Sequence, residues 1–205
     1  MFLGGRKMLG LPESTEVRQF ISKAAIYRKF ELNNSQQTSF DEDIKKITIV
    51  NEISSQTVKL TGNDDNSFFV LEVQLKHKNY DKKSIERLSK LIDQNILLLL
   101  TYEDEARLAV FKTILHETEW KSLENIKLTL TGLSFDALWE NVIRTVGGIE
   151  TQEETTLEEQ ITSNIEKAKI QKQIDVLKKK MKSEKQFNRQ IEIKAEIEKL
   201  EEKIK

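Results

Sequence analysis

The chain has 205 residues, of which 33 are Lys or Arg and 34 are Asp or Glu, so its formal net charge is −1 at pH 7. This balance neither requires nor excludes a nucleic-acid partner, because only the local distribution of charge bears on that question. The sequence has no cysteine, which excludes disulfides and cysteine-based metal sites. No apolar run approaches the roughly 18 residues of a membrane span, and the N-terminus lacks the apolar stretch of a signal peptide, so we expect a cytoplasmic protein without a membrane partner.

The first predicted element follows the single proline, Pro12, and is a helix that begins near Ser14. Ser14 can act as its N-cap, and Glu16 suits the positive end of the helix. The apolar residues that follow recur at helical spacing and form one stripe: Val17, Phe20, Ile21, Ala24 and Tyr27. The polar segment 33–39 then indicates a loop.

Three strands are predicted next, over residues 47–53, 57–61 and 68–76. The first is rich in β-branched residues, and turn-forming residues over 61–66 separate the other two. The third has the alternation of a half-buried strand. In it Leu71, Val73 and Leu75 alternate with Glu72, Gln74 and Lys76.

A helix over residues 81–93 leads into the unbroken apolar run 96–100, which is typical of a strand covered on both faces. A strand, a helix and another strand of these lengths predict a right-handed parallel crossover. Residues 106–113 are expected to form the hairpin partner of this apolar strand.

The last elements of the body are an alternating strand over residues 126–131 and an amphipathic helix over 135–146, which Gly147 and Gly148 end. The fold class is therefore α+β: a mixed β-sheet with flanking helices and an αβββαβ-like core, followed by a C-terminal α-helical hairpin or coiled coil. We place the α+β domain at residues 1–148, a linker at 149–156 and the helical appendage at 157–205.

The appendage contains no glycine or proline, and its apolar residues recur at alternating steps of three and four. The pattern breaks between Met181 and Ile193, and Ser183 and Gln186 have the spacing of a capping box. This predicts two antiparallel helices that meet near residues 182–186, with a single bent helix as the alternative. The seam residues form the candidate partner-binding surface, unless they only complete the core of their own chain: Ile170, Ile174, Leu177, Met181, Ile193, Ile197, Leu200 and Ile204.

Residues 178–189 carry six basic side chains against one acid, Glu184, with an aromatic residue among them. Such a segment can contact nucleic-acid phosphates and bases. The alternative is a solvated lysine-rich turn. The candidate nucleic-acid residues are Lys178, Lys179, Lys180, Lys182, Lys185, Phe187 and Arg189.

One enzymatic pattern is present, because the predicted order of elements over residues 14–102 resembles the core of restriction-endonuclease-like nucleases. Such folds place an acid near the second strand and an acid-x-Lys pair on the third to hold Mg²⁺. The candidate catalytic residues are Asp64, Asp65, Glu72, Gln74 and Lys76. The alternative is an ordinary polar strand face; no cofactor is expected outside the nuclease hypothesis, and the two distant histidines, His77 and His116, predict no metal site.

Several segments together resemble a bacterial family known as domain of unknown function 4391: residues 11–17, 43–47, 71–76, 81–83, 118–120 and 184–190. The resemblance spans nearly the whole chain from Met8. It implies a place beside DNA methyltransferases and helicases in restriction-like or anti-phage loci, and hence an accessory subunit. It also implies an acid-x-Lys pair on the third strand, where this chain has Gln74.

Three functional hypotheses follow from these patterns. The first is a non-catalytic adaptor of a DNA-modification or anti-phage assembly, which docks a methyltransferase or helicase subunit, or a second copy of itself, through the seam. The second is a Mg²⁺-dependent nuclease. The third is a nucleic-acid-binding module that acts through residues 178–189.

Overall fold

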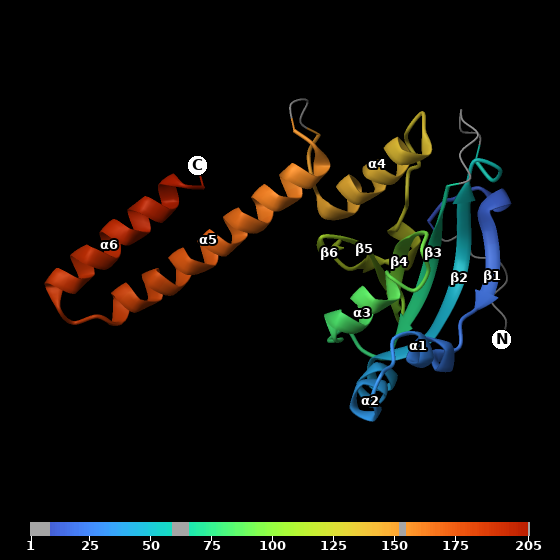
Figure 1. Ribbon diagram of the computed structural model, residues 1–205, viewed down its shortest axis with the longest axis horizontal. Coiled ribbons are helices and arrows are strands. Elements are labelled where there is room, and N and C mark those ends of the chain that lie inside the picture. Colours follow the sequence, from blue (N-terminus) through green and yellow to red (C-terminus); the bar gives the residue numbers. More distant parts are fainter. Residues whose placement is uncertain (1–8, 59–65, 152–154, 205) are drawn as a thin grey trace. The chain divides into compact units, whose positions relative to one another are not determined.

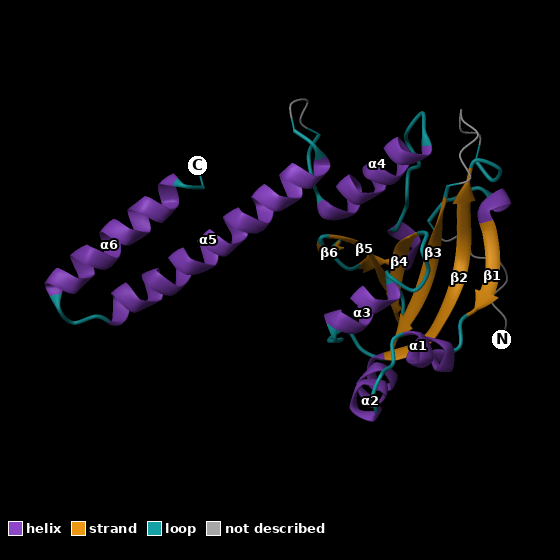
Figure 2. Ribbon diagram, in the orientation of Figure 1, coloured by secondary structure: helices purple, strands orange, loops and turns teal. Residues whose placement is uncertain are grey.

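The computed structural model describes residues 9–58, 66–151 and 155–204. The chain divides into two compact units, Met1–Glu150 and Thr151–Lys205. Figure 1 shows the elements in chain order, and Figure 2 distinguishes helices from strands. The first unit combines a sheet with helices and the second is helical, so the chain is an α+β protein, as predicted.

In the described part of the first unit, seven strands form one mixed sheet in the order β1-β2-β3-β4-β5-β6, and β7 pairs with β5 (Figure 2). The strands are β1 (Glu16–Phe20), β2 (Ile44–Ser54), β3 (Ser67–Leu75), β4 (Asn95–Tyr102), β5 (Glu105–Lys112), β6 (Ile114–Glu117) and β7 (Lys121–Ser122). β3 and β4 are parallel and the other neighbours are antiparallel. The predicted parallel crossover and the hairpin that follows it are therefore confirmed.

Helices flank the sheet on both faces. They are α1 (Lys23–Lys29), α2 (Asn34–Asp43), α3 (Lys82–Leu88) and α4 (Phe135–Gly147), with 3-10 turns at Glu13–Thr15 and Leu123–Asn125. Residues of α1, α2 and α3 share one core with Leu71 and Val73 of β3. Successive strand residues point to opposite faces, and Phe68 accordingly contacts Phe135 and Trp139 of α4, with ring centroids 6.1 and 5.0 Å apart.

The second unit is a helical hairpin made of α5 (Leu157–Ser183) and α6 (Phe187–Glu202), which run antiparallel (Figure 1). Thr156 and Glu159 cap the start of α5 reciprocally, each accepting a hydrogen bond from the other's backbone N–H. Ile174, Ile193 and Ile197 are buried between the helices. The hairpin is therefore confirmed, and the single bent helix is excluded.

The predicted N-terminal helix is wrong, because residues 16–20 form the edge strand β1 and the first α-helix begins only at Lys23. Ser14 does not cap a helix; its hydroxyl donates to the carbonyl of Thr57 over 2.7 Å. Ser22 is the N-cap instead. Val17 still packs against the core, so the apolar pattern identified an inward-facing residue but not the element that carries it, because sheet pairing overrode helical spacing.

The predicted loop over residues 33–39 is also wrong, because these residues begin α2. Asn33 and Gln36 form a complete capping box, in which each side chain accepts from the other's backbone N–H over 3.0 Å. Phe40, fully buried, anchors the helix in the core. The capping residues were visible in the sequence, but Phe40 is the single large apolar residue within α2, so the helix has no apolar stripe.

Three further elements differ from expectation. Thr57 and Val58 lie in a turn rather than a strand, and residues 59–61 of that predicted strand lie outside the described residues. The predicted strand at 126–131 forms only one isolated bridge, Leu9↔Lys127, although Ile126 and Leu128 are buried as the alternation suggested. α3 ends at Leu88 rather than near residue 93.

Candidate functional site

The eight seam residues predicted from the heptad-like spacing come together in one cluster. Ile174, Ile193 and Ile197 are buried, and the other five pack around them: Ile170, Leu177, Met181, Leu200 and Ile204. Since each helix covers the apolar stripe of the other, these side chains stabilise the hairpin itself. Any surface that the hairpin offers to another molecule must consist largely of other residues.

The turn that joins the two helices comprises residues 184–186. The capping box predicted there is wrong: Ser183 is the last residue of α5, and its hydroxyl donates to the carbonyl of Lys180 over 3.0 Å. Glu184 organises the turn instead, since its Oε1 accepts the backbone N–H groups of Gln186 and Lys185 over 3.0 and 2.8 Å. These hydrogen bonds hold the pKa of Glu184 below its usual value.

We call residues 178–189 the basic tip of the hairpin. Lys178 pairs with Glu201 of α6 over 2.7 Å. Among the described residues, the other five basic side chains of the tip have no carboxylate partner within ion-pair distance, and all five are exposed: Lys179, Lys180, Lys182, Lys185 and Arg189. Because Glu184 is the only acid of the tip and is committed to the turn, the tip presents positive charge.

The basic tip also carries an exposed aromatic ring. Phe187 is the first residue of α6 and is 72% exposed. It is not among the residues that pack in the seam. Ile191, one turn later on the same side of α6, is 52% exposed. The structure therefore places the predicted nucleic-acid residues together at one end of the hairpin.

The candidate nuclease residues are only partly assembled. Glu72 and Gln74 share one face of β3, where Gln74 Nε2 donates to Glu72 Oε1 over 3.3 Å. The cross-strand neighbour of Glu72 is Thr48, whose buried hydroxyl has no partner among the described residues. Asp64 and Asp65 lie outside the described residues.

Lys76 follows the last residue of β3, and its charge acts on a different carboxylate, Asp41. Burial alone would raise the pKa of Asp41, but hydrogen bonds from Lys23 and Tyr27, together with the charge of Lys76, lower it. No three His, Asp or Glu side chains converge as metal ligands in the part of the chain that the structure describes. Glu72 is the single carboxylate of β3, which is too few for a Mg²⁺ site by itself.

A charged network that the sequence did not reveal centres on Glu117 of β6, whose side chain is 5% exposed. The Tyr80 hydroxyl donates to Glu117 Oε1, Lys82 Nζ lies 2.5 Å from Oε2, and an Arg107 nitrogen lies 3.8 Å from Oε1. Burial would raise the pKa of Glu117, but its hydrogen bonds from Lys82 and Tyr80 and the charge of Arg107 lower it. The Arg107 guanidinium also lies 5.2 Å from the ring centroid of Trp120.

This network joins the connection between β3 and α3 to the far strand of the sheet. The Glu117 carboxylate accepts hydrogen bonds from two donors and lies beside the Arg107 guanidinium, so the network is a structural clamp rather than an open binding site. Tyr80 and Lys82 are 37 and 35 residues away from Glu117 in the sequence. No local spacing could therefore have indicated that these side chains meet.

A protein family matches this chain over nearly the whole length of the chain. The matching family is the domain of unknown function 4391 (DUF4391), whose sequence model aligns with residues 9–204. The chain belongs to this family. The match extends over both units, so the hairpin is part of the DUF4391 domain rather than an addition to it. No curated protein matches the chain, and no solved structure does.

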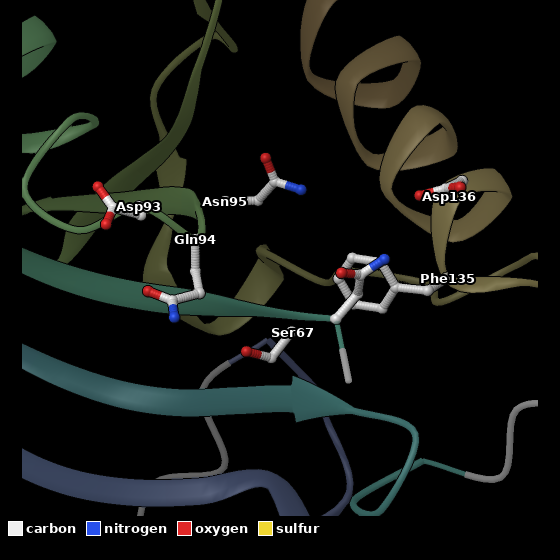
Figure 3. A pocket seen from close by; sticks show the side chains of 7 residues that line it. Ser67, Asp93, Gln94, Asn95, Phe135 and Asp136 are labelled. Carbon is white, nitrogen blue, oxygen red and sulfur yellow. The ribbon is translucent and has the colours of Figure 1, made fainter. Parts of the chain in front are cut away.

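Two other properties of this DUF4391 protein bear on its partners. No helix in the described ranges is both long and apolar enough to cross a membrane. A polar pocket of about 270 Å³ lies where β3, β4 and α4 begin. Its lining includes two carboxylates, Asp93 and Asp136, with Asn95 between them in the view of Figure 3. The lining of this pocket is acidic, whereas the tip of the hairpin is basic.

Proposed function

We propose that this DUF4391 protein is a non-catalytic accessory subunit of a bacterial DNA-modification or anti-phage assembly, located in the cytoplasm, and that its helical hairpin makes the contact. The observation that supports this most strongly is the closed seam. Because the eight apolar residues pack against one another, the 27-residue helix α5 and the 16-residue helix α6 form a unit with its own core. Their outward side chains remain exposed and serve recognition.

The charge of the hairpin is unevenly distributed, which supports an oriented contact. The basic tip has six basic residues against one acid, whereas residues 192–202 of α6 have five acids against two lysines. Separated charges of this kind steer association and fix the orientation of a partner. A methyltransferase or helicase subunit is the partner class that we propose, and self-association is the alternative.

The test is purification of the tagged full-length protein from its native host at moderate salt, with and without nuclease treatment. We expect a protein subunit to co-elute in stoichiometric amount and to remain after nuclease treatment, because the proposed assembly is held by protein contacts. Aspartate substitutions at two positions of α5 form a matched pair. Val176 is 64% exposed, whereas Ile174 is fully buried. Val176→Asp tests the outward face without opening the seam. A clean monomer at moderate salt would contradict the accessory role.

A Mg²⁺-dependent nuclease is the second candidate, favoured by the Glu72–Gln74 pair beside the unpartnered Thr48 hydroxyl. If this face is catalytic, metal-dependent cleavage of DNA by the purified protein is abolished in Glu72→Gln while the thermal midpoint stays unchanged. The control is Glu52→Gln, which changes a partly exposed glutamate of the neighbouring strand β2. Cleavage that persists in Glu72→Gln, or that is absent from the wild type, excludes this site.

A further inference from the structure

We propose that the basic tip binds single-stranded nucleic acid, with phosphates contacting its lysines and one base stacked on Phe187. This inference goes beyond the proposed function, because it assigns a nucleic-acid ligand to one end of the hairpin that is proposed to contact a protein subunit. It joins two observations: a cluster of exposed, unpaired cations and an exposed aromatic ring within that cluster.

The cations supply affinity for a polyanion. Five basic residues of the tip are exposed and lack a carboxylate partner among the described residues, while Lys178 is paired with Glu201. The only acid of the tip, Glu184, accepts two backbone N–H groups of the turn. Each phosphate that a lysine or arginine neutralises releases counterions, so the affinity depends steeply on salt.

The aromatic ring indicates what kind of polyanion is bound. Phe187 is 72% exposed and lies outside the residues that pack in the seam. A ring held by the first turn of a helix presents a flat face, on which an unpaired base can stack regardless of its identity. In a duplex the bases are already stacked on one another, so a single strand is the better ligand.

Other polyanions fit the tip less well. An anionic membrane surface would favour a broad apolar face beside the lysines, but on this part of α6 only Phe187 and Ile191 are exposed large apolar residues. An acidic protein segment would use the lysines but would not require the ring. The experiment tests the membrane alternative with vesicles, and Phe187→Ala tests whether binding requires the ring.

The experiment measures binding of full-length protein to a short labelled oligothymidylate by fluorescence anisotropy over a series of salt concentrations. For four or five neutralised phosphates, the plot of log Kd against log salt has a slope of roughly 3. Lys179→Gln/Lys180→Gln/Lys182→Gln is expected to lower that slope by roughly 2, since about 0.7 is lost per phosphate contact on a single strand. The matched control makes the same lysine-to-glutamine change at three exposed positions of α5 outside the tip: Lys167, Lys169 and Lys172. This control is expected to leave the slope unchanged.

The ring is tested separately from the charge. Phe187→Ala is expected to weaken binding about 5- to 100-fold with little change in salt slope, because stacking is not a charge interaction. Ile191→Ala, on the same side of α6 and also exposed, is the control and has little effect. The altered side chains are all exposed, so far-UV circular dichroism should show an intact hairpin in each variant.

Three results would overturn this inference. They are the absence of binding at low salt, equal losses in Phe187→Ala and Ile191→Ala, and equal affinity for the matching duplex or for phosphatidylserine vesicles. If any of these occurs while a protein subunit still co-elutes after nuclease treatment, the accessory function stands and only the nucleic-acid ligand is wrong. If no subunit co-elutes but the oligonucleotide binds as expected, the tip is a nucleic-acid site and the accessory function is wrong.

Discussion

Replacing Ile174 with aspartate is expected to unfold the helical hairpin while the α+β unit stays folded. Ile174 is fully buried in the seam, where only Ile193 and Ile197 are buried with it. Loss of a buried isoleucine costs about 2–5 kcal/mol, and an unpaired carboxylate in its place adds a desolvation penalty. Two helices joined by so small a core have little stability to lose, because isolated helices are marginal in water.

The measurement is far-UV circular dichroism of the full-length protein, together with limited proteolysis. Ile174→Asp should lose helical signal and become sensitive to cleavage within residues 155–204, whereas fragments of the first unit should survive. Val176→Asp introduces the same charge two residues away at a position that is 64% exposed, and should behave like the wild type. Equal helicity in the two variants would show that the seam does not hold the hairpin together.

Replacing Glu117 with alanine is expected to destabilise the α+β unit by about 3 kcal/mol. The change removes the buried acceptor of the Tyr80 hydroxyl and the carboxylate that pairs with the Arg107 guanidinium, and the Arg107 side chain is only 16% exposed. Lys82 can turn to solvent, because its side chain is 66% exposed. The loss should be read from the midpoint of urea denaturation at neutral pH.

Glu119, two residues further along and exposed, provides the control. Glu119→Ala should change the free energy of unfolding by no more than about 0.5 kcal/mol. If the two alanine variants have the same midpoint, the network around Glu117 contributes no net stability and the clamp interpretation is wrong.

The same network predicts a dependence on pH. The pKa of Glu117 is lowered from its ordinary value of 4.5, so the unfolded state takes up a proton before the folded state does. The stabilisation by Glu117 is therefore fully present above pH 4.5 and is lost as the pH falls through the lower folded pKa. The difference in unfolding free energy between the wild type and Glu117→Ala should shrink over that acidic range.

Long, regular patterns in the sequence predicted structure well. The unbroken run 96–100 became the central strand β4, whose residues Leu97 to Leu100 are fully buried. The four-three-four spacing around Ile174 and Ile197 placed every seam residue in one cluster. Both patterns succeed because burial of a whole face decides the element, whatever the neighbouring chain does.

Short or sparsely apolar elements were harder to predict. β1 spans five residues with helix-compatible spacing, and only its pairing with β2 makes it a strand. α2 has Asn33 and Gln36 as a capping box, but Phe40 is its only large buried apolar residue. The spacing of apolar residues therefore does not indicate a helix there. The network around Glu117 depends on contacts across 35 and 37 residues, which one sequence cannot reveal.

The edges of the sheet limit how copies of this protein can meet. In the described residues the sheet ends at β1 on one side and at β6 on the other, and these strands span five and four residues. β1 also carries the exposed charges of Glu16 and Arg18. Short and charged edges disfavour strand-to-strand growth into continuous intermolecular sheets. A second copy is therefore expected to associate through surfaces other than the sheet edges, and fibrous aggregation through the native sheet edges is disfavoured.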